Sequence, residues 1–292
     1  MTTLKRLGVL AHPVRPQTAP VADHIAATLK ARGLDVWSFA DWEEDQVLPH
    51  LAKTDMVIAI GGDGAMLRAG RVCAQSEVPV LGVNMGHLGF LTEVQDLSAW
   101  VETLDTVLSG DYWIEQRMMI RATGWRDGAQ LFAADALNDV VISRGTVMGI
   151  IQVDTYVDGD WTTTYNADAL VISTATGSTA YALASGGPIL PPELRNILLV
   201  PVAPHLSLDR PIVLPEGATV EVVVTEDVRT QTVVAADGAA LGELLAHDRV
   251  RVTASERVCR FVRLRERNYF YRSLLDRLEP RIPVAPRRDE VG

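Results

Sequence analysis

The chain has 292 residues, of which 48% are hydrophobic and 22% are charged, a balance typical of a soluble globular protein of about two domains. Its formal net charge of −10 argues against general nucleic-acid binding, which favours a basic surface. There is no apolar run of about 18 residues and no apolar leader, so we expect a cytoplasmic protein with neither a nucleic-acid nor a membrane partner.

Strand and helix patterns alternate over the first part of the chain. Short apolar runs predict strands at residues 7–10, 35–39, 56–60 and 80–83, and periodic segments predict helices at residues 19–32, 65–74 and 97–108. Such alternation is typical of right-handed βαβ units. We therefore expect residues 1–115 to form an α/β domain with a parallel sheet and flanking helices.

Short strands dominate from about residue 118 onward. Residues 152–157 alternate polar and apolar side chains, and Asp158-Gly159 then supplies a hairpin turn. Similar patterns predict strands at residues 219–225, 231–235, 249–253 and 258–264. We expect a β-rich second domain over residues 116–266, a helix over residues 267–280 that packs back on the first domain, and a disordered tail over residues 281–292.

The turn after the third predicted strand carries the strongest chemical signal. It reads Gly61-Gly62-Asp63-Gly64 and lies at the carboxyl end of a strand, where open α/β sheets bind their ligands. Glycines let a phosphate or a sugar approach the backbone, and the free N–H groups of the following helix attract anions. A carboxylate belongs beside phosphates only if it binds a metal, accepts a proton or holds a hydroxyl. The turn therefore predicts phosphoryl transfer or nucleotide recognition, and an ordinary tight turn with an exposed Asp63 is the alternative.

Polar residues mark two more strand ends. Residues 84–91 contain an amide and two glycines, which could line the crevice opposite Asp63 or could form a simple glycine-rich connection. Asn138-Asp139 interrupts an apolar run. An asparagine amide matches the edge of an adenine, and an aspartate accepts hydrogen bonds from ribose hydroxyls. A polar strand start is the alternative for this pair.

Hydroxyl groups surround one glycine at residues 174–181. This loop could donate hydrogen bonds to a ligand, with Tyr181 stacking on a base, whereas capping of a helix by Ser178 or Thr179 is the alternative. Asp168, just upstream, is a lone carboxylate that enters an apolar strand, which favours a functional role. Asp237-Gly238 by itself indicates only a turn.

The cysteines and histidines carry no metal signal. Cys73 and Cys259 lie far apart in the sequence, and neither they nor the six histidines show the spacing of metal ligands or of a redox motif. We therefore expect reduced thiols and no metal site made of these residues.

These motifs occur together, in this order, in one known family. Besides the turn at Asp63, the shared motifs are Asn84-x-Gly86-x-Leu88-Gly89, Leu137-Asn138-Asp139, Thr176-Gly177-Ser178-Thr179-Ala180-Tyr181, Ser185-Gly186-Gly187-Pro188, Arg210-Pro211 and Asp237-Gly238. From about residue 5 to residue 278, the chain resembles bacterial NAD kinases. It departs from them at Ala175, where the family has proline, and at Ala239, where the family has a polar residue. The first change loosens the loop entropically, and the second removes a polar contact.

The resemblance implies an enzyme that transfers the γ-phosphate of ATP to the 2′-hydroxyl of the adenosine ribose of NAD and so makes NADP. It also implies a divalent metal, Mg²⁺, held mainly by the ATP phosphates, with polyphosphate as an alternative donor. A homodimer or homotetramer is expected, with each site in the cleft between the α/β domain and a β-rich NAD-binding domain. Two other functions stay open: a non-catalytic NAD(P)-binding sensor, and a related small-molecule or lipid kinase with the same glycine turn.

Matched position by position, the resemblance implies one catalytic residue, Asp63, which would orient the 2′-hydroxyl and take its proton. A carboxylate is a weak base for an alcohol, so the proton would move late in the reaction. The resemblance further implies a set of cofactor-binding residues: Asp63, Gly64, Arg68, Asn138, Asp139, Asn166, Asp168, Thr179, Ala180, Tyr181 and Ala184.

Overall fold

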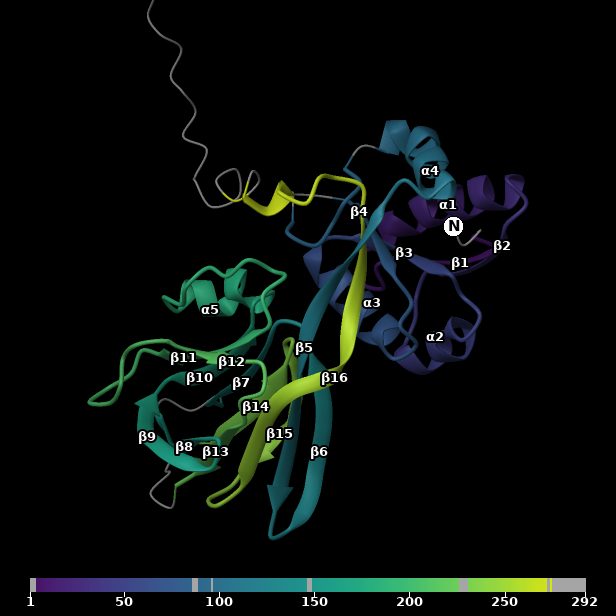
Figure 1. Ribbon diagram of the computed structural model, residues 1–292. Coiled ribbons are helices and arrows are strands. Elements are labelled where there is room, and N and C mark those ends of the chain that lie inside the picture. Colours follow the sequence, from purple (N-terminus) through teal and green to yellow (C-terminus); the bar gives the residue numbers. More distant parts are fainter. Residues whose placement is uncertain are drawn as a thin grey trace, which may run out of the picture.

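A computed structural model describes residues 4–85, 89–95, 97–145, 149–225, 231–271 and 274. An α/β part lies at one end and a β-rich part at the other, and the long strands β5 (Trp113–Arg126) and β16 (Arg249–Arg263) run between them (Figure 1). This arrangement confirms the predicted combination of an N-terminal α/β domain with a β-rich C-terminal domain.

The α/β part is built on parallel strands, as predicted, and their order in the sheet is β2-β1-β3-β4. Its strands are β1 (Arg6–Leu10), β2 (Asp35–Phe39), β3 (Met56–Gly61) and β4 (Val80–Asn84), and its helices are η1 (Pro16–Thr18), α1 (Ala19–Ala31), α2 (Glu44–Leu51), α3 (Asp63–Ala74), η2 (Leu97–Ala99) and α4 (Trp100–Ser109). β3 is buried along its whole length because its alternate side chains enter two cores, Val57 and Ala59 in one, Ile58 and Ile60 in the other. Burial on both faces explains its uninterrupted apolar run.

Helix α2 has no counterpart among the predicted elements. Pro49 lies inside this helix and hides its periodicity. A capping box begins the helix: the Glu43 side chain accepts from the backbone of Gln46, and the Gln46 side chain accepts from the backbone N–H of Glu43. Helix propensity and the spacing of apolar residues therefore do not predict α2, which the capping box in its first turn stabilises.

The β-rich part contains a second, antiparallel sheet and an extension of the first one. The second sheet has the order β12-β11-β10-β7-β14-β15, with β7 (Asp139–Arg144), β10 (Ala169–Thr174), β11 (Asn196–Val202), β12 (Ile212–Pro215), β14 (Thr232–Ala236) and β15 (Ala239–Leu244). β6 (Ala129–Ala136), β8 (Ile151–Val157), β9 (Asp160–Ala167) and β13 (Val220–Val224) belong to the first sheet, and η3 (Gly177–Thr179) and α5 (Tyr181–Ala184) follow β10. The predicted Asp158-Gly159 turn joins β8 to β9, with φ of 54° and 90°.

Strand β16 joins the two parts. Two separate strands are predicted here, but they form one strand with an irregularity between Ala254 and Val258. β16 pairs with β5 along its length and with β4 through Phe261 and Val80, so the sheet of the α/β part continues into the β-rich part. The two parts therefore share backbone hydrogen bonds.

The start of the predicted C-terminal helix packs against the segment after β4. Tyr269 and Phe270 are each 5% exposed, and the rings of Phe90 and Phe270 lie 6.1 Å apart. Most of the helix predicted over residues 267–280, the tail predicted over residues 281–292 and the motif glycine Gly86 lie outside the described residues. Among the described helices, none is long and apolar enough to span a membrane.

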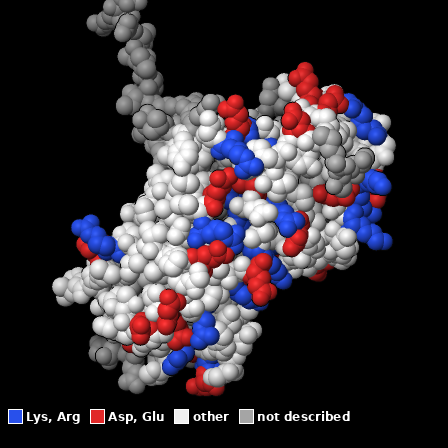
Figure 2. Space-filling view, in the orientation of Figure 1, with Lys and Arg blue, Asp and Glu red and all other residues white. Residues whose placement is uncertain are grey.

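The visible surface mixes charges of both signs. Figure 2 shows Lys and Arg side chains beside Asp and Glu side chains on one face of the molecule. Many of them form ion pairs, such as Arg71 with Glu44 at 2.9 Å and Arg260 with Glu77 at 2.7 Å. Each exposed pair contributes little to stability because solvent screens it.

Candidate active site

Asp63 lies where β3 ends and α3 begins. Its carboxylate is half-buried and accepts two backbone N–H groups, from Phe90 at 2.7 Å and from Leu91 at 2.9 Å. Both donors lie on the segment after β4. This segment, for which a crevice lining and a simple glycine-rich connection were the two alternatives, therefore holds the Asp63 carboxylate in place. A Cβ at Gly62 or Gly64 would meet nothing within 4 Å, so the turn is open beside the carboxylate.

Gly89 touches the Asp63 side chain directly. A Cβ built on Gly89 would lie 1.9 Å from Oδ1 of Asp63 and 2.4 Å from its Cγ. No side chain fits there while the carboxylate keeps its place. Gly89 is therefore a residue on which the geometry of Asp63 depends, and the sequence signal for it is only its place in the glycine-rich stretch after β4.

A pocket of about 200 Å³ lies beside the turn, between the end of β1 and the first turns of α3. Among its lining residues are His12, Trp42, Gly64 and Arg68. The Arg68 guanidinium lies 4.3 Å from the centre of the Trp42 ring and pairs with Glu43 at 2.8 Å. Burial lowers the pKa of His12, and the charges of Arg15 and Arg68 act in the same direction. The Nδ1 of His12 accepts a hydrogen bond from the backbone N–H of Val14 at 3.1 Å.

The second half of the site lies where β7 begins and β10 ends. Asp139 pairs with Ser173 across the two strands. The hydroxyl of Ser173 and the backbone N–H of Thr174 both donate to the carbonyl of Asn138, at 3.0 and 2.9 Å. A Cβ on Gly177 would lie 2.2 Å from that same carbonyl. The structure thus brings Asn138 and Asp139 together with the hydroxyl loop that follows β10.

Within this loop, the capping role considered for Ser178 and Thr179 is wrong. α5 starts after Ala180 without a side-chain cap. Ser178 instead donates to the carbonyl of Ala175 at 2.7 Å and accepts from the backbone of Leu190 at 3.0 Å, which closes the loop on itself. Thr179 and Ala180 are half-buried, whereas Tyr181 and Ala184 are exposed, Tyr181 by 43%.

Asp237 holds the backbone of the Asn138-Asp139 pair, a contact that an Asp-Gly turn by itself does not reveal. Its carboxylate accepts the backbone N–H groups of Leu137 at 2.8 Å, Asn138 at 2.7 Å and Asp139 at 3.2 Å. The three donors lie 98 to 100 positions away from Asp237 in the sequence. Asp237 therefore fixes the backbone that presents Asn138 and Asp139. The sequence signals for it are the Asp-Gly turn and its place among the motifs of the resemblance.

With NAD, the substrate that the sequence resemblance implies, we expect Asp237→Asn to raise the KM about tenfold or more and to change kcat by less than about threefold, since hydrogen bonds to charged groups contribute about 1.5–3 kcal/mol. An amide has one acceptor oxygen, and its NH₂ group would face a backbone donor. Steady-state kinetics with varied NAD would measure both constants. The matched control is Asp158→Asn, because Asp158 is also a positive-φ residue of an Asp-Gly turn whose carboxylate accepts a backbone N–H. Equal effects of the two substitutions would contradict the assignment.

Asp139 and Asp237 are two acidic groups in one buried region. Burial raises the pKa of Asp139 to about 7, and the nearby charge of Asp237 adds to the shift. Burial also raises the pKa of Asp237, although its three backbone donors oppose that rise. A folded-state pKa above the unfolded value means that the native protein holds its proton more tightly than the unfolded chain does.

The free energy of unfolding should therefore show a contribution from Asp139 that is fully present below about pH 4 and is lost as pH rises through about 7. We expect Asp139→Asn to match the wild type near pH 4 and to exceed it at pH 8, by at most about 4 kcal/mol. Urea unfolding across this range measures the difference. Asp160→Asn, at an exposed position on β9, is the control. A difference that stays constant with pH would contradict the expectation.

Asn166 on β9 and Asp168 just before β10 lie away from the hydroxyl loop that follows β10. Asp168 precedes β10, whereas the hydroxyl loop follows it, and six residues of strand span about 20 Å. Asp168 pairs there with Arg144 at 3.4 Å, and the carbonyl of Asn166 accepts from the backbone of His205 at 2.7 Å. One chain therefore does not bring these two residues together with Asn138, Asp139 and Thr179.

Two family models match the chain. The ATP-NAD kinase N-terminal domain matches residues 11–112, and the ATP-NAD kinase C-terminal domain matches residues 137–264. Among similar curated proteins, an NAD kinase of Chloroflexus aurantiacus is 40% identical over 279 residues, which are 94% of this chain and 99% of that protein. An NAD kinase of Dehalococcoides mccartyi is 36% identical over 276 residues, or 94% and 96% of the two chains.

Solved structures share the fold. A yeast NADH kinase complexed with NADH has a TM-score of 0.83 and 22% identity, covering 95% of this chain and 88% of that one. An NAD kinase from Archaeoglobus fulgidus in complex with ATP has a TM-score of 0.71 and 24% identity, covering 92% and 97%.

Proposed function

The chain belongs to the ATP-NAD kinase family, and we propose that Asp63 is the general base of its reaction, the ATP-dependent phosphorylation of NAD to NADP. The observation that carries the assignment is the pair of backbone hydrogen bonds from Phe90 and Leu91, which fix the Asp63 carboxylate at the open end of β3. Each carboxylate oxygen keeps a second acceptor position beside the one that it uses, so a ribose hydroxyl can still donate to it.

NAD would be held mainly by the β-rich half. We assign the adenosine part to Asn138, Asp139 and the loop containing Thr179, Ala180 and Tyr181, because these residues lie around one junction of β7 and β10. The 2′-hydroxyl would then point toward Asp63, which would orient it and take its proton as the new bond to phosphorus forms. Phosphoryl transfer has a loose transition state, so positioning and charge neutralisation account for most of the acceleration.

The phosphates of the donor would lie at the glycine turn. The start of α3 presents free backbone N–H groups, and the open space at Gly62 and Gly64 lets an anion come close. His12 and Arg68 line the adjoining pocket. We assign Gly64 and Arg68 to this donor side of the site.

Mg²⁺ fits such a site if the phosphates supply most of its ligands. Within the described ranges, no three His, Cys, Asp or Glu side chains gather in a metal-binding group. Mg²⁺ commonly binds through one or two carboxylates together with substrate phosphates and water. When bound, it would neutralise charge on the transferred phosphoryl group. Asp63 supplies a carboxylate at this glycine turn.

A second copy of the chain would complete the pocket. Asp168 is separated from the hydroxyl loop of its own chain by the length of β10, about 20 Å from the strand rise, and Asn166 lies on β9, two residues before Asp168. We propose that these two residues act in the site of a partner subunit within a homodimer or homotetramer. Tyr181 and Ala184, which are exposed in the single chain, would then also be covered by ligand or partner.

The test is direct. The purified protein would be incubated with NAD, ATP and Mg²⁺, and NADP would be assayed with an NADP-specific dehydrogenase. NADP formation that requires both substrates supports the proposal. NAD binding without product would indicate a sensor, and phosphorylation of diacylglycerol without NADP would indicate a lipid kinase. Replacing ATP by polyphosphate, and NAD by NADH, would define the donor and the acceptor.

A further inference from the structure

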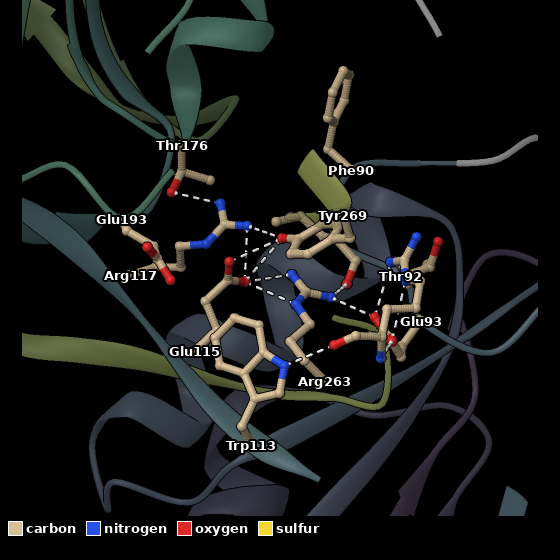
Figure 3. A network of polar contacts seen from close by, with 12 residues as sticks. Phe90, Thr92, Glu93, Trp113, Glu115, Arg117, Thr176, Glu193, Arg263 and Tyr269 are labelled. Atoms are coloured by element: carbon tan, nitrogen blue, oxygen red, sulfur yellow. Dashed lines mark hydrogen bonds and ion pairs between the residues drawn. The ribbon is translucent and has the colours of Figure 1, made fainter. Parts of the chain in front are cut away.

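A buried ion cluster lies beneath the site, where the two halves of the molecule meet (Figure 3). We define it as Glu115 and Arg117 on β5, Arg263 at the end of β16, and Tyr269 from the segment that follows. Each of these four residues is 5% exposed or less. Glu115 pairs with Arg117 at 2.9 Å and with Arg263 at 2.7 Å, so one carboxylate serves two guanidinium groups.

One side of the cluster reaches Asp63. Arg263 donates through Nη1 to the carbonyl of Leu91 at 2.8 Å. The backbone N–H of the same Leu91 donates to Oδ1 of Asp63 at 2.9 Å. A single residue thus connects the proposed base to a buried guanidinium. Glu93 strengthens this side, because its carboxylate accepts from Arg265 at 2.8 Å and from the backbone of Leu264 at 2.9 Å.

The other side of the cluster reaches the hydroxyl loop. Arg117 donates through Nη1 to the hydroxyl of Thr176 at 3.1 Å and through Nη2 to the hydroxyl of Tyr269 at 2.8 Å. The Tyr269 hydroxyl in turn donates to Glu115 at 2.9 Å. Thr179, which belongs to the nucleotide-binding set, donates to the carbonyl of Thr176 at 3.3 Å. Figure 3 shows Thr176 joined to Arg117 by a dashed line and the Phe90 side chain pointing away from Tyr269.

Stability alone does not explain this cluster. Burial raises the pKa of Glu115, but Arg117 and Arg263 outweigh it and hold the pKa below its ordinary value. Glu115 is therefore ionised, and the fold bears the desolvation of several charges. Well-packed apolar residues often replace buried ion pairs without loss of stability. A fully connected polar network, in contrast, sets one geometry and resists small displacements.

We propose that Arg117 and Tyr269 are positioning residues, which set the nucleotide-holding loop at residues 174–181 relative to Asp63. This rests on the proposed function, because the loop then holds NAD while Asp63 accepts its proton. On this proposal, NAD contacts mainly one half of the site and the phosphate donor mainly the other. Only the reaction depends on how the two halves are placed, and a misplacement of about 1 Å can cost about 100-fold in rate.

Tyr269→Phe removes the hydroxyl that bridges Arg117 and Glu115 and keeps the ring. We expect kcat for NADP formation to fall about tenfold and the KM for NAD to stay within about threefold of the wild type. The reason is that the loop at residues 174–181 keeps its contacts with NAD but changes its position relative to Asp63. Thr176→Val breaks the neighbouring link to Arg117 and should give the same division between the two constants. It also tests the proposal should Tyr269→Phe not fold.

A double variant that combines both substitutions distinguishes a positioning role from a general loss of structure. The double variant Tyr269→Phe/Thr176→Val should lose little more kcat than the stronger single variant, since both break one connection. Tyr165→Phe is the control: Tyr165 is fully buried, and its hydroxyl has no hydrogen-bond partner among the described residues. It should keep wild-type kinetics.

Wild-type activity, measured first, tests the proposed function independently of these variants. An active wild type with unchanged kcat in both Tyr269→Phe and Thr176→Val would overturn the positioning role. A rise in the KM for NAD at unchanged kcat would also overturn it, because misplacement of the loop relative to Asp63 lowers kcat. Fully additive losses of kcat in the double variant would overturn it as well, because the two substitutions break the same connection.

Discussion

Asp63→Asn is expected to lower kcat for NADP formation at least about 100-fold while NAD still binds, because a general base typically contributes about 10²–10⁴-fold. The amide cannot accept the proton of the 2′-hydroxyl. The residues assigned to NAD lie mainly on β7 and in the loop after β10, so calorimetry should find NAD affinity within about threefold of the wild type. Turnover would be followed by coupled assay at saturating NAD and ATP.

The substitution also disturbs two backbone hydrogen bonds, so it needs a control that does the same elsewhere. Asp55 supplies one: its carboxylate accepts the backbone N–H groups of Lys5 at 2.7 Å and Arg6 at 2.9 Å. Asp55 precedes β3, whereas Asp63 follows it, so the two lie at opposite ends of one strand. Asp55→Asn should lower stability and leave kcat near its wild-type value. Near-normal turnover in Asp63→Asn would reject the role of Asp63 as base.

Gly89→Ala is expected to lower kcat by about 10- to 100-fold, with a small change in the KM for NAD, since misplacement of a catalytic group by about 1 Å has an effect of this size. Its Cβ would lie within 2.7 Å of the whole Asp63 carboxylate group, so the carboxylate or the segment must move. Either movement breaks the hydrogen bonds from Phe90 and Leu91.

Two comparisons decide whether the loss acts through Asp63. Gly217→Ala is the control, because a Cβ there would meet nothing within 4 Å and no positive φ is required. In the Asp63→Asn background, Gly89→Ala should cause almost no further loss of kcat, since the base that it displaces is already absent. A full additional loss in that background would show that Gly89 acts on something other than Asp63.

The α/β half could be predicted well from the sequence, and the reason is that its signals are local. The buried run of β3, the turn at Asp63 and the start of α3 follow one another along the chain, so spacing and residue type were sufficient. The Asp158-Gly159 hairpin was predicted for the same reason. Helix α2 was missed because Pro49 interrupts its pattern, and β16 was divided in two because its irregularity resembles a break between strands.

The partners of the site residues were not predictable in this way. Asp63 accepts hydrogen bonds from residues 27 and 28 positions away in the sequence. Asp237 accepts them from backbone groups 98 to 100 positions away. Glu115 and Arg263 are 148 positions apart. Such partners follow from which strands become neighbours, and no local pattern encodes that.

By itself, the sequence determined the kind of chemistry: a carboxylate among glycines at the end of a buried strand, and a family of motifs that binds NAD. Only the tertiary structure decided how that carboxylate is held, that Gly89 must lack a side chain, and that a buried ion cluster connects Asp63 to the hydroxyl loop. The physical reason is that residue type sets what a group can do, whereas its direction depends on hydrogen bonds and packing from distant strands, which exist only after the sheet has formed.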